Sequence, residues 1–149
     1  GLEKSHLQNI AYQENLENVT FLPPVSKLAI PNLVQYFDCC YVGAKNCSLY
    51  RFGISMNKIY DSMMSGKPLL YAINAPNNYA EIYQCGVSVI PGNVNSIEKG
   101  IEILMHMSGE ERASMGNNGK HAVLEHFEYS ILAKQFIDAI MINGGYDEK

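Results

Sequence analysis

The sequence predicts an α/β fold with a mainly parallel sheet, and three observations lead to this prediction. Three continuous apolar runs, at residues 38–43, 68–73 and 87–91, suit strands that are buried on both faces. Segments with helical periodicity separate these runs, and such alternation is typical of parallel βαβ units. The chain has 149 residues, of which 47% are hydrophobic and 17% charged, so it is large enough to bury a core.

Helical patterns account for most of the remaining chain. The predicted helices lie at residues 3–15, 26–37, 57–65, 78–84 and 110–126, and in two amphipathic segments around residues 97–105 and 132–140. Gly116 and Gly119 leave open an interruption within the longest of these helices. Residues 18–23 (NVTFLP) form a short β-rich run. We expect one domain over residues 1–142 and a frayed tail over residues 143–149.

The helix predicted over residues 57–65 is the element around which the chain is organised. A loop with Gly53 precedes it, and Ser55 is the expected N-cap. Gly66 is expected to end the helix. Since the loop follows the strand predicted at 38–43, the start of this helix should lie at the carboxyl edge of the sheet.

The two sides of this helix differ in character. Its polar side chains follow the spacing i, i+3, i+4 and i+7, so they share one side: Lys58, Asp61, Ser62 and Ser65. Ile59 and Met63 lie on another side and can face a core. Free backbone N–H groups and the helix dipole make such a helix start suitable for anions, above all phosphate. A polar side that is merely solvated is the alternative.

Composition and motifs exclude several classes of function. A net charge of −4 and scattered basic residues argue against a nucleic-acid scaffold. No apolar run is long enough to span a bilayer. Four cysteines fit no zinc motif and are expected to be reduced thiols, mostly in the core, of a cytoplasmic protein: Cys39, Cys40, Cys47 and Cys85. No Asp-x-Asp motif and no Ser-His-Asp or Cys-His arrangement stands out, so we expect no essential metal and no cofactor.

Four segments carry patterns that are more specific than periodicity. Residues 54–70 (ISMNKIYDSMMSGKPLL) resemble the signature SPNK-L-(F/Y)-(E/D)-Y-M-A-x-G-K-P, and residues 110–127 (EERASMGNNGKHAVLEHF) resemble e-x-r-x-x-m-g-x-n-g-r. Residues 21–38 and 81–91 resemble two further segments of the same set of proteins. These proteins are bacterial retaining glycosyltransferases with two Rossmann-like domains, the GT-B architecture. The similarity covers residues 1–140 without a large gap.

The resemblance implies the C-terminal domain of such an enzyme, which binds a nucleotide-sugar donor. It also implies truncation at the N-terminal side, because Gly1 matches a glycine just after the second strand of that domain. The expected fold is therefore the Rossmann-like parallel sheet of a GT-B C-terminal domain without its first strands. We expect three strands, with residues 18–23 displaced or completed by another chain. Self-association at the truncated sheet edge is an option that the sequence leaves open.

The resemblance also implies roles for individual residues. Lys58 is the expected catalytic residue, facing the donor diphosphate, and Asp61 matches a carboxylate that accepts hydrogen bonds from the ribose. The other expected donor-binding residues are Gly53, Ile54, Ser55, Met56 and Asn57 around the diphosphate and sugar, and Pro24 near the base. Two of these depart from the family: Gly53 stands where many members carry a Glu, and Met56 where the signature has a Pro. Further candidates, which suit ordinary solvated or capping roles equally, are Lys45, Arg51, Tyr79 and Glu81.

The function that the resemblance predicts is retaining transfer of a sugar from a nucleotide-diphosphate donor, expected to be UDP-linked. The acceptor would be a saccharide or a lipid-linked molecule, bound by the missing N-terminal domain during capsular or other cell-envelope polysaccharide or lipopolysaccharide synthesis. The full-length enzyme would act in the cytoplasm, at the inner face of the membrane, and the fragment alone would be inactive. The alternatives are a non-catalytic Rossmann-like nucleotide-binding or interaction module, and a nucleotide-sugar epimerase, whose acid/base carboxylates and histidines are not evident.

Overall fold

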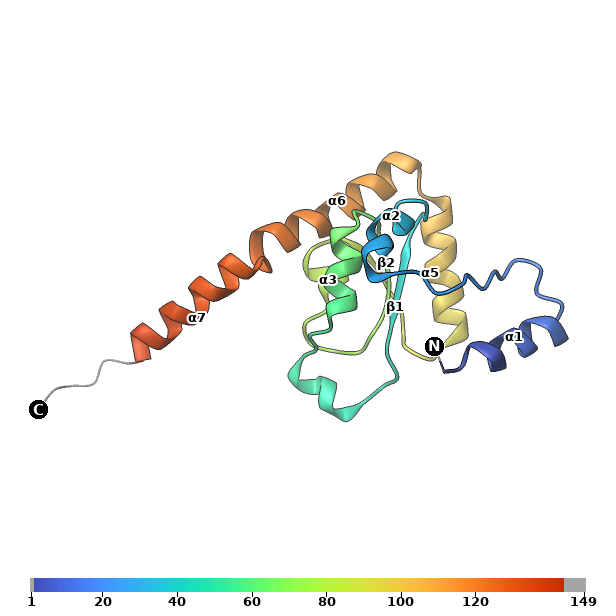
Figure 1. Cartoon of the computed structure of the whole chain (residues 1–149), viewed down its shortest axis with the longest axis horizontal. Coiled ribbons are helices and arrows are strands. Elements are labelled where there is room, and N and C mark those ends of the chain that lie inside the picture. Colours follow the sequence, from blue (N-terminus) through green and yellow to red (C-terminus); the bar gives the residue numbers. More distant parts are fainter. Residues whose placement is uncertain (1, 144–149) are drawn as a thin grey trace, which may run out of the picture. The chain divides into compact units, whose positions relative to one another are not determined.

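The computed structural model describes residues 2–143 (Figure 1). The chain divides into two compact units, Gly1–Ile30 and Pro31–Lys149, and each is described by itself. The second unit contains the sheet and all residues that form the hydrophobic core.

The first unit contains α1 (Lys4–Gln13), an extended segment and the 3₁₀ turn η1 (Lys27–Ala29). The β-rich run at residues 18–23 forms no strand. A strand needs a neighbour for its backbone hydrogen bonds, and the sheet does not include these residues. This agrees with the expectation that they are displaced from the sheet. The Lys4 ammonium donates to the Leu22 carbonyl oxygen at 2.7 Å.

The helix predicted over residues 26–37 is shorter than expected and is divided in two. After η1 comes α2 (Ile30–Val34), in which Pro31 is the second residue. Proline suits this position because the first N–H groups of a helix have no acceptor within it. The predicted position of Pro31 near the helix start is therefore confirmed.

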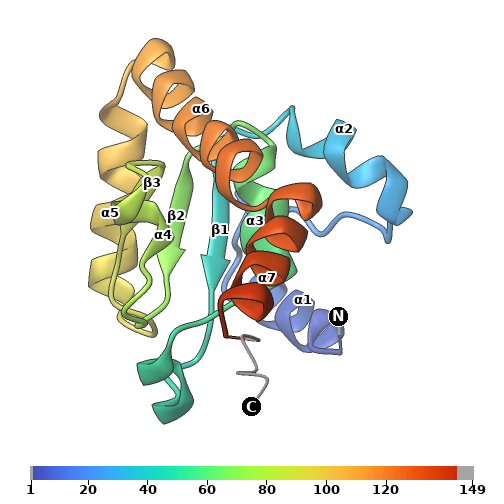
Figure 2. The ribbon, with the colours of Figure 1, turned by 90° about the vertical axis from the view of Figure 1, so that its left-hand side faces the viewer.

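The sheet consists of three parallel strands in the order β1 (Cys40–Gly43), β2 (Leu69–Ala72) and β3 (Gly86–Ser88). Cys40 pairs with Leu69, and Leu69 pairs with Gly86. The prediction of an α/β fold with a parallel sheet of three strands is confirmed. Because all three strands run the same way, their carboxyl ends meet at one edge of the sheet (Figure 2).

Helices cover both faces of this sheet (Figure 2). On one face, α5 (Val94–His106) packs against β2 and β3, and a Cβ at Gly100 would come within 2.7 Å of the Leu70 side chain. On the other face, α3 (Asn57–Met64) packs against β1 and against α6 (Gly109–His126). The short helix α4 (Tyr79–Ile82) connects β2 to β3.

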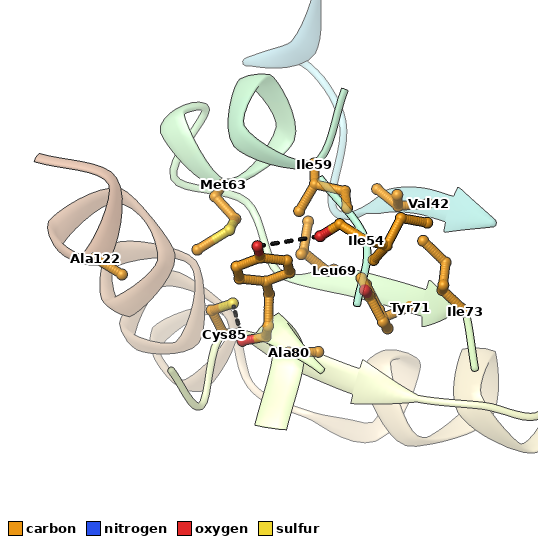
Figure 3. Close-up of a cluster of buried hydrophobic side chains, with 11 residues drawn as sticks. Val42, Ile54, Ile59, Met63, Leu69, Tyr71, Ile73, Ala80, Cys85 and Ala122 are labelled. Carbon is orange, nitrogen blue, oxygen red and sulfur yellow. Dashed lines mark hydrogen bonds between the residues drawn. The ribbon is translucent and has the colours of Figure 1, made fainter. Parts of the chain in front are cut away.

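The core lies between the sheet and the layer of α3 and α6 (Figure 3). Its largest fully buried side chains include Tyr71 and Leu69 of β2 and Ile59 and Met63 of α3. The predicted inward orientation of Ile59 and Met63 is therefore confirmed. The other buried members of this core are Val42, Ile54, Ile73, Tyr79, Ala80, Cys85 and Ala122.

The strands are less uniformly buried than their apolar sequences predict. All four residues of β2 are buried, as expected for a central strand with helices on both faces. In β1, however, Tyr41 is 59% exposed, and β3 is only half-buried along its length. The prediction that these two runs are buried on both faces is therefore wrong. Both strands lie at the edges of the sheet, where the cover is incomplete.

The interruption that the sequence left open does not occur, because α6 runs without a break from Gly109 to His126. Gly116 and Gly119 are buried and lie where α6 meets α3. A Cβ at Gly116 would collide with the carbonyl oxygen of Gly66. Glycine here allows close packing of two elements rather than a helix break.

The helix α7 (Tyr129–Asn143) follows α6, and residues 144–149 of the predicted frayed tail lie outside the described residues. Within residues 2–143, no helix has both the length and the apolar character needed to cross a membrane.

The four cysteines are free thiols, but they are not mostly in the core as predicted. Cys85 is buried, and burial raises the pKa of its thiol to about 11. Cys39 and Cys40 are half-buried, and burial raises their pKa values as well. Cys47 is exposed because it lies in the loop after β1 rather than in a strand.

Candidate functional site

The start of α3 lies near the carboxyl end of β1, as the sequence predicts. Helix α3 begins at Asn57 and ends at Met64, within one residue of the predicted end. Gly66 follows with φ +71°, a conformation that favours glycine and stops the helix. The first N–H groups of the helix have no acceptor within it, so this end can accept an anion.

The N-cap prediction is wrong in its residue. The N-cap is Met56, which has an extended backbone and makes no side-chain capping bond. The Ser55 hydroxyl instead lies 3.2 Å from the Tyr60 hydroxyl. The N–H groups at the helix start are therefore not capped by either side chain.

Lys58 brings a positive charge to this edge of the sheet. Its Nζ donates to the carbonyl oxygen of Gly43, the last residue of β1, at 2.8 Å. The side chain is exposed, so the ammonium has donors left for a ligand. The predicted position of Lys58 at the carboxyl edge is confirmed, whereas its contact with a diphosphate stays a prediction.

The polar side of α3 is divided between two ends of the helix. Asp61 is exposed, and within residues 2–143 the ion pair present joins Arg112 to Asp38 instead. The Ser65 hydroxyl donates to the Ser62 carbonyl oxygen at 2.6 Å and lies 3.8 Å from the Cys40 thiol, at the start of β1. Of the predicted polar face, Lys58 lies at the carboxyl edge and Ser65 lies at the opposite edge.

The loop before α3 is hydrogen-bonded to the loop after β2, and sequence reasoning did not predict this contact. The Asn77 side chain bonds both backbone groups of Ile54: the Ile54 N–H donates to Asn77 Oδ1 at 2.8 Å, and Asn77 Nδ2 donates to the Ile54 carbonyl oxygen at 2.7 Å. The Ile54 side chain is buried in the core below (Figure 3). Ile54 is therefore fixed in place. The other predicted backbone donors come directly after it, at Ser55, Met56 and Asn57.

Two tyrosine hydroxyls extend the same hydrogen-bond network. The Tyr79 hydroxyl donates to the Ile54 carbonyl oxygen at 3.2 Å and lies 3.0 Å from the Tyr60 hydroxyl. Burial, and then the hydrogen bond with Tyr60, raise the pKa of Tyr79, so its hydroxyl stays neutral and can donate. Tyr79 is thus a core residue with a polar tip, not a ligand group on the surface.

Gly53 is required by this arrangement. Its φ is +101°, which L side chains rarely adopt, and a Cβ there would lie 3.2 Å from Asn77 Oδ1. A Glu at this position, as in many members of the family that the sequence resembles, would strain the loop. The structure therefore gives a physical reason for the departure from the family pattern.

The remaining candidates lie apart from this network. The Arg51 guanidinium is 4.6 Å from the ring centroid of Phe52, a cation–π contact in η2 (Ser48–Phe52). Lys45 and Glu81 are exposed. Asn78, not Glu81, caps α4, because its side-chain oxygen accepts from the Glu81 N–H. Pro24 is exposed in the first unit, and its contact with a base stays a prediction.

A cavity of 410 Å³ lies at the carboxyl ends of β2 and β3, on the same sheet edge as Lys58. Its lining is formed by Asn46, Ile73, Asn74, Asn78, Glu81, Ser88, Val89, Ile90, Pro91 and Ser96. Asn78 Nδ2 donates to the Ser88 hydroxyl at 2.7 Å, so part of this lining is already fixed. In the part of the chain that the structure describes, no group of three or more His, Cys, Asp or Glu side chains could hold a metal ion.

Asn77 is the residue of this site that sequence reasoning missed. Its segment, NAPNN, indicates only a turn-rich loop after a strand. Its partner Ile54 is 23 positions earlier in the chain, and no periodic pattern connects the two. The position of Asn77 after β2 could have indicated the contact, because loops at the carboxyl ends of neighbouring parallel strands lie close together.

Comparisons with known proteins identify the family and the fold of the chain. A family model described as "Glycosyl transferases group 1" matches residues 1–122. A search of curated proteins found no match. Among solved structures, the chain is similar to the sucrose-phosphate synthase from Thermosynechococcus elongatus, with a TM-score of 0.76 and 17% identity. That match covers 95% of this chain and 34% of the other, so this chain spans about a third of that length. The likeness confirms the predicted Rossmann-like fold.

Proposed function

The chain belongs to the glycosyl transferases group 1 family, and from this premise we propose that it binds the nucleotide-diphosphate sugar of a longer glycosyltransferase. The full enzyme transfers the sugar with retention of configuration to a saccharide or lipid-linked acceptor, in cell-envelope polysaccharide or lipopolysaccharide synthesis at the inner face of the membrane. The donor is UDP-linked, and no metal or cofactor takes part.

The observation that carries this proposal is the position of the Lys58 ammonium. It lies 2.8 Å from the carbonyl oxygen of Gly43, beside the uncapped N-terminus of α3. As the glycosidic bond breaks, negative charge builds on the diphosphate leaving group. A fixed ammonium and a set of aligned N–H groups stabilise that charge in the transition state. They are already oriented toward it, whereas water molecules would have to reorient during the reaction. Lys58 is the catalytic residue in this proposal.

Asp61 supports the same reading from the next turn of α3. Its carboxylate is exposed and lies three residues beyond Lys58, which is one helical turn. An ionised carboxylate accepts from two hydroxyls at once, as binding of a ribose requires. We propose that Asp61 holds the ribose.

The proposal is tested by titrating the isotopically labelled chain with UDP and then with GDP while the amide resonances are followed by NMR. We expect resonances of Ser55, Met56, Asn57 and Lys58 to shift, with tighter binding of UDP. Lys58→Ala removes a charge-assisted hydrogen bond and should weaken binding by about tenfold or more. Asp61→Asn keeps the shape of the side chain and should weaken binding to a lesser extent.

Two matched controls use exposed residues of other helices: Lys99→Ala in α5 and Asp138→Asn in α7. Each changes the net charge by the same amount as its counterpart and should leave binding unaltered. Binding that falls equally in Lys58→Ala and Lys99→Ala would show a general charge effect. The proposal would be contradicted by that result, and equally by a folded chain that binds neither nucleotide.

One observation favours a second candidate, a nucleotide-binding or interaction module without catalysis. Gly53 supplies no carboxylate for the sugar, and its φ of +101° and its closeness to Asn77 leave no place for one. A transfer assay with the full-length protein separates the two candidates. Turnover of the donor that Lys58→Ala abolishes supports the enzyme, whereas nucleotide binding without turnover supports the module.

The outer edge of β1 gives this domain a further surface for a partner. Within residues 2–143, β1 pairs with β2 on one side and with no strand on the other. Unpaired strand edges can accept another strand. We propose that the rest of the enzyme or a second copy of the chain completes the sheet there, which sedimentation at several concentrations can test for the second copy.

A further inference from the structure

We propose that Asn77 is a positioning residue of this site, which fixes the backbone of Ile54 and thereby aims the N–H groups of Ser55, Met56 and Asn57 at the ligand. This inference rests on the proposed function, because it assumes that these N–H groups meet the donor diphosphate. It adds a residue from the loop after β2 to a site otherwise formed by α3 and the loop before it.

The geometry of the Asn77 side chain supports this role. One planar carboxamide accepts from the Ile54 N–H at 2.8 Å and donates to the Ile54 carbonyl oxygen at 2.7 Å. The contacts themselves assign the two ends of the amide, because only its oxygen can accept from an N–H. Both backbone groups of a single residue are therefore held from outside, and the conformation of Ile54 is fixed at the point where the loop turns toward α3.

The polar protons of Asn77, Tyr79 and Tyr60 all have acceptors within this network. The second proton of Asn77 Nδ2 goes to the Tyr79 hydroxyl at 2.9 Å, and Tyr79 donates its own proton to the Ile54 carbonyl oxygen. Tyr60 must then donate to Tyr79, so the Ser55 hydroxyl must donate to Tyr60. Networks in which each proton has a partner hold one geometry, whereas half-satisfied networks do not.

Aromatic rings support the network from the core side. The Phe127 ring, at the end of α6, lies 4.8 Å from the Tyr60 ring and 5.7 Å from the Tyr79 ring. Edge-to-face contact also joins the Tyr60 and Tyr79 rings, at 5.7 Å and 75°. The two hydroxyls are thus held by packing as well as by hydrogen bonds.

Two consequences follow for the site. The Ile54 N–H already has an acceptor, so the backbone groups that are left for an anion begin at Ser55. The loop before α3 and the loop after β2 are joined side chain to backbone, so they move together. Loss of Asn77 should therefore disturb ligand binding without removing any group that touches the ligand.

The experiment compares Asn77→Ala with Asn95→Ala, a matched control in α5 whose exposed side chain is outside this network and outside the lining of the cavity. Amide hydrogen exchange of Ile54 and the affinity for UDP are measured in both variants and in the unsubstituted chain. In Asn77→Ala we expect Ile54 exchange about tenfold faster and UDP binding about tenfold weaker. Asn95→Ala should change neither.

A second, milder variant distinguishes loss of this hydrogen-bond network from general unfolding of the chain. Tyr79→Phe keeps the ring and removes one donor to the Ile54 carbonyl oxygen, so we expect a smaller loss of affinity and retained slow exchange of the Ile54 N–H. Asn77→Ala that binds UDP like the unsubstituted chain would overturn the inference while the proposed function stands. A chain that binds no UDP would overturn the proposed function and this role with it, although Ile54 exchange would still decide whether Asn77 fixes the loop.

Discussion

Helices α1 and α3 both carry an apolar stripe, but only one of the two stripes is buried. In α1, Leu7 is 48% and Ile10 is 38% exposed, and no residue between 2 and 30 is buried. In α3, Ile59 and Met63 are both 0% exposed. The comparison teaches that a stripe identifies the side of a helix that can be buried, whereas burial depends on which elements cover that side.

The starts of α1 and α6 also differ. Helix α1 begins after Glu3, whose side chain makes no capping bond. Helix α6, in the second unit, begins with a capping box in which Ser108 and Glu111 bond each other's backbone N–H groups. The second unit is thus stabilised by buried side chains and, at α6, by a capped helix start, and each can be removed separately.

The largest expected difference comes from the same substitution in the two helices. Ile59→Ala leaves a cavity in the core and should lower the free energy of unfolding by about 2–5 kcal/mol. Ile10→Ala removes a partly exposed side chain and should lower it by about 0.5 kcal/mol. Urea unfolding of both variants measures the difference. Equal losses would show that α1 is buried in solution and would break the comparison.

A smaller effect is expected where α6 packs against α3. Gly116→Ala places a methyl group against the Gly66 carbonyl oxygen and should destabilise the chain by about 1–3 kcal/mol. Gly109→Ala is the matched control, because nothing lies within 4 Å of a Cβ at that position. The control should lose no stability in the same unfolding measurement. A Gly116→Ala variant as stable as the control would mean that the two helices separate easily.

The smallest effect is a pH dependence at the start of α6. Hydrogen bonds from the Ser108 backbone N–H and side chain lower the pKa of Glu111 below its ordinary value of 4.5. The folded pKa is therefore below the unfolded one, so this stabilisation is present above pH 4.5 and is lost as pH falls through the folded pKa. Urea midpoints measured between pH 6 and pH 3 should fall less steeply for Glu111→Gln. Parallel curves would show that the capping box is open in solution.

Local signals predicted the elements well where a short segment decides them. The end of α3 depends on Gly66, which lies two residues after the helix and has a φ of +71°. The three strands were identified because each is a compact apolar run. By contrast, Ser55 has the character of an N-cap, yet its hydroxyl bonds Tyr60, since the turn geometry makes Met56 the N-cap.

Long-range contacts account for what the sequence did not predict. Gly116 left open a break in α6, but its missing side chain instead makes room for the carbonyl oxygen of Gly66, in the turn between α3 and β2. Asn77 lies 23 residues from Ile54, and only the meeting of two loops at one sheet edge brings them together. Edge position, not sequence, exposes Tyr41 in an otherwise apolar strand.

The sequence by itself determined the α/β class, the parallel strands, the family pattern and the position of Lys58 near a helix start. The family pattern follows from the resemblance of four segments, and the others follow from periodicity, helix-end residues and spacing, which act over a few neighbouring residues. The tertiary structure alone decided which stripes are buried and how Ile54 is held by Asn77. Burial and side-chain hydrogen bonds between distant segments depend on how the chain returns on itself, and no local pattern encodes that.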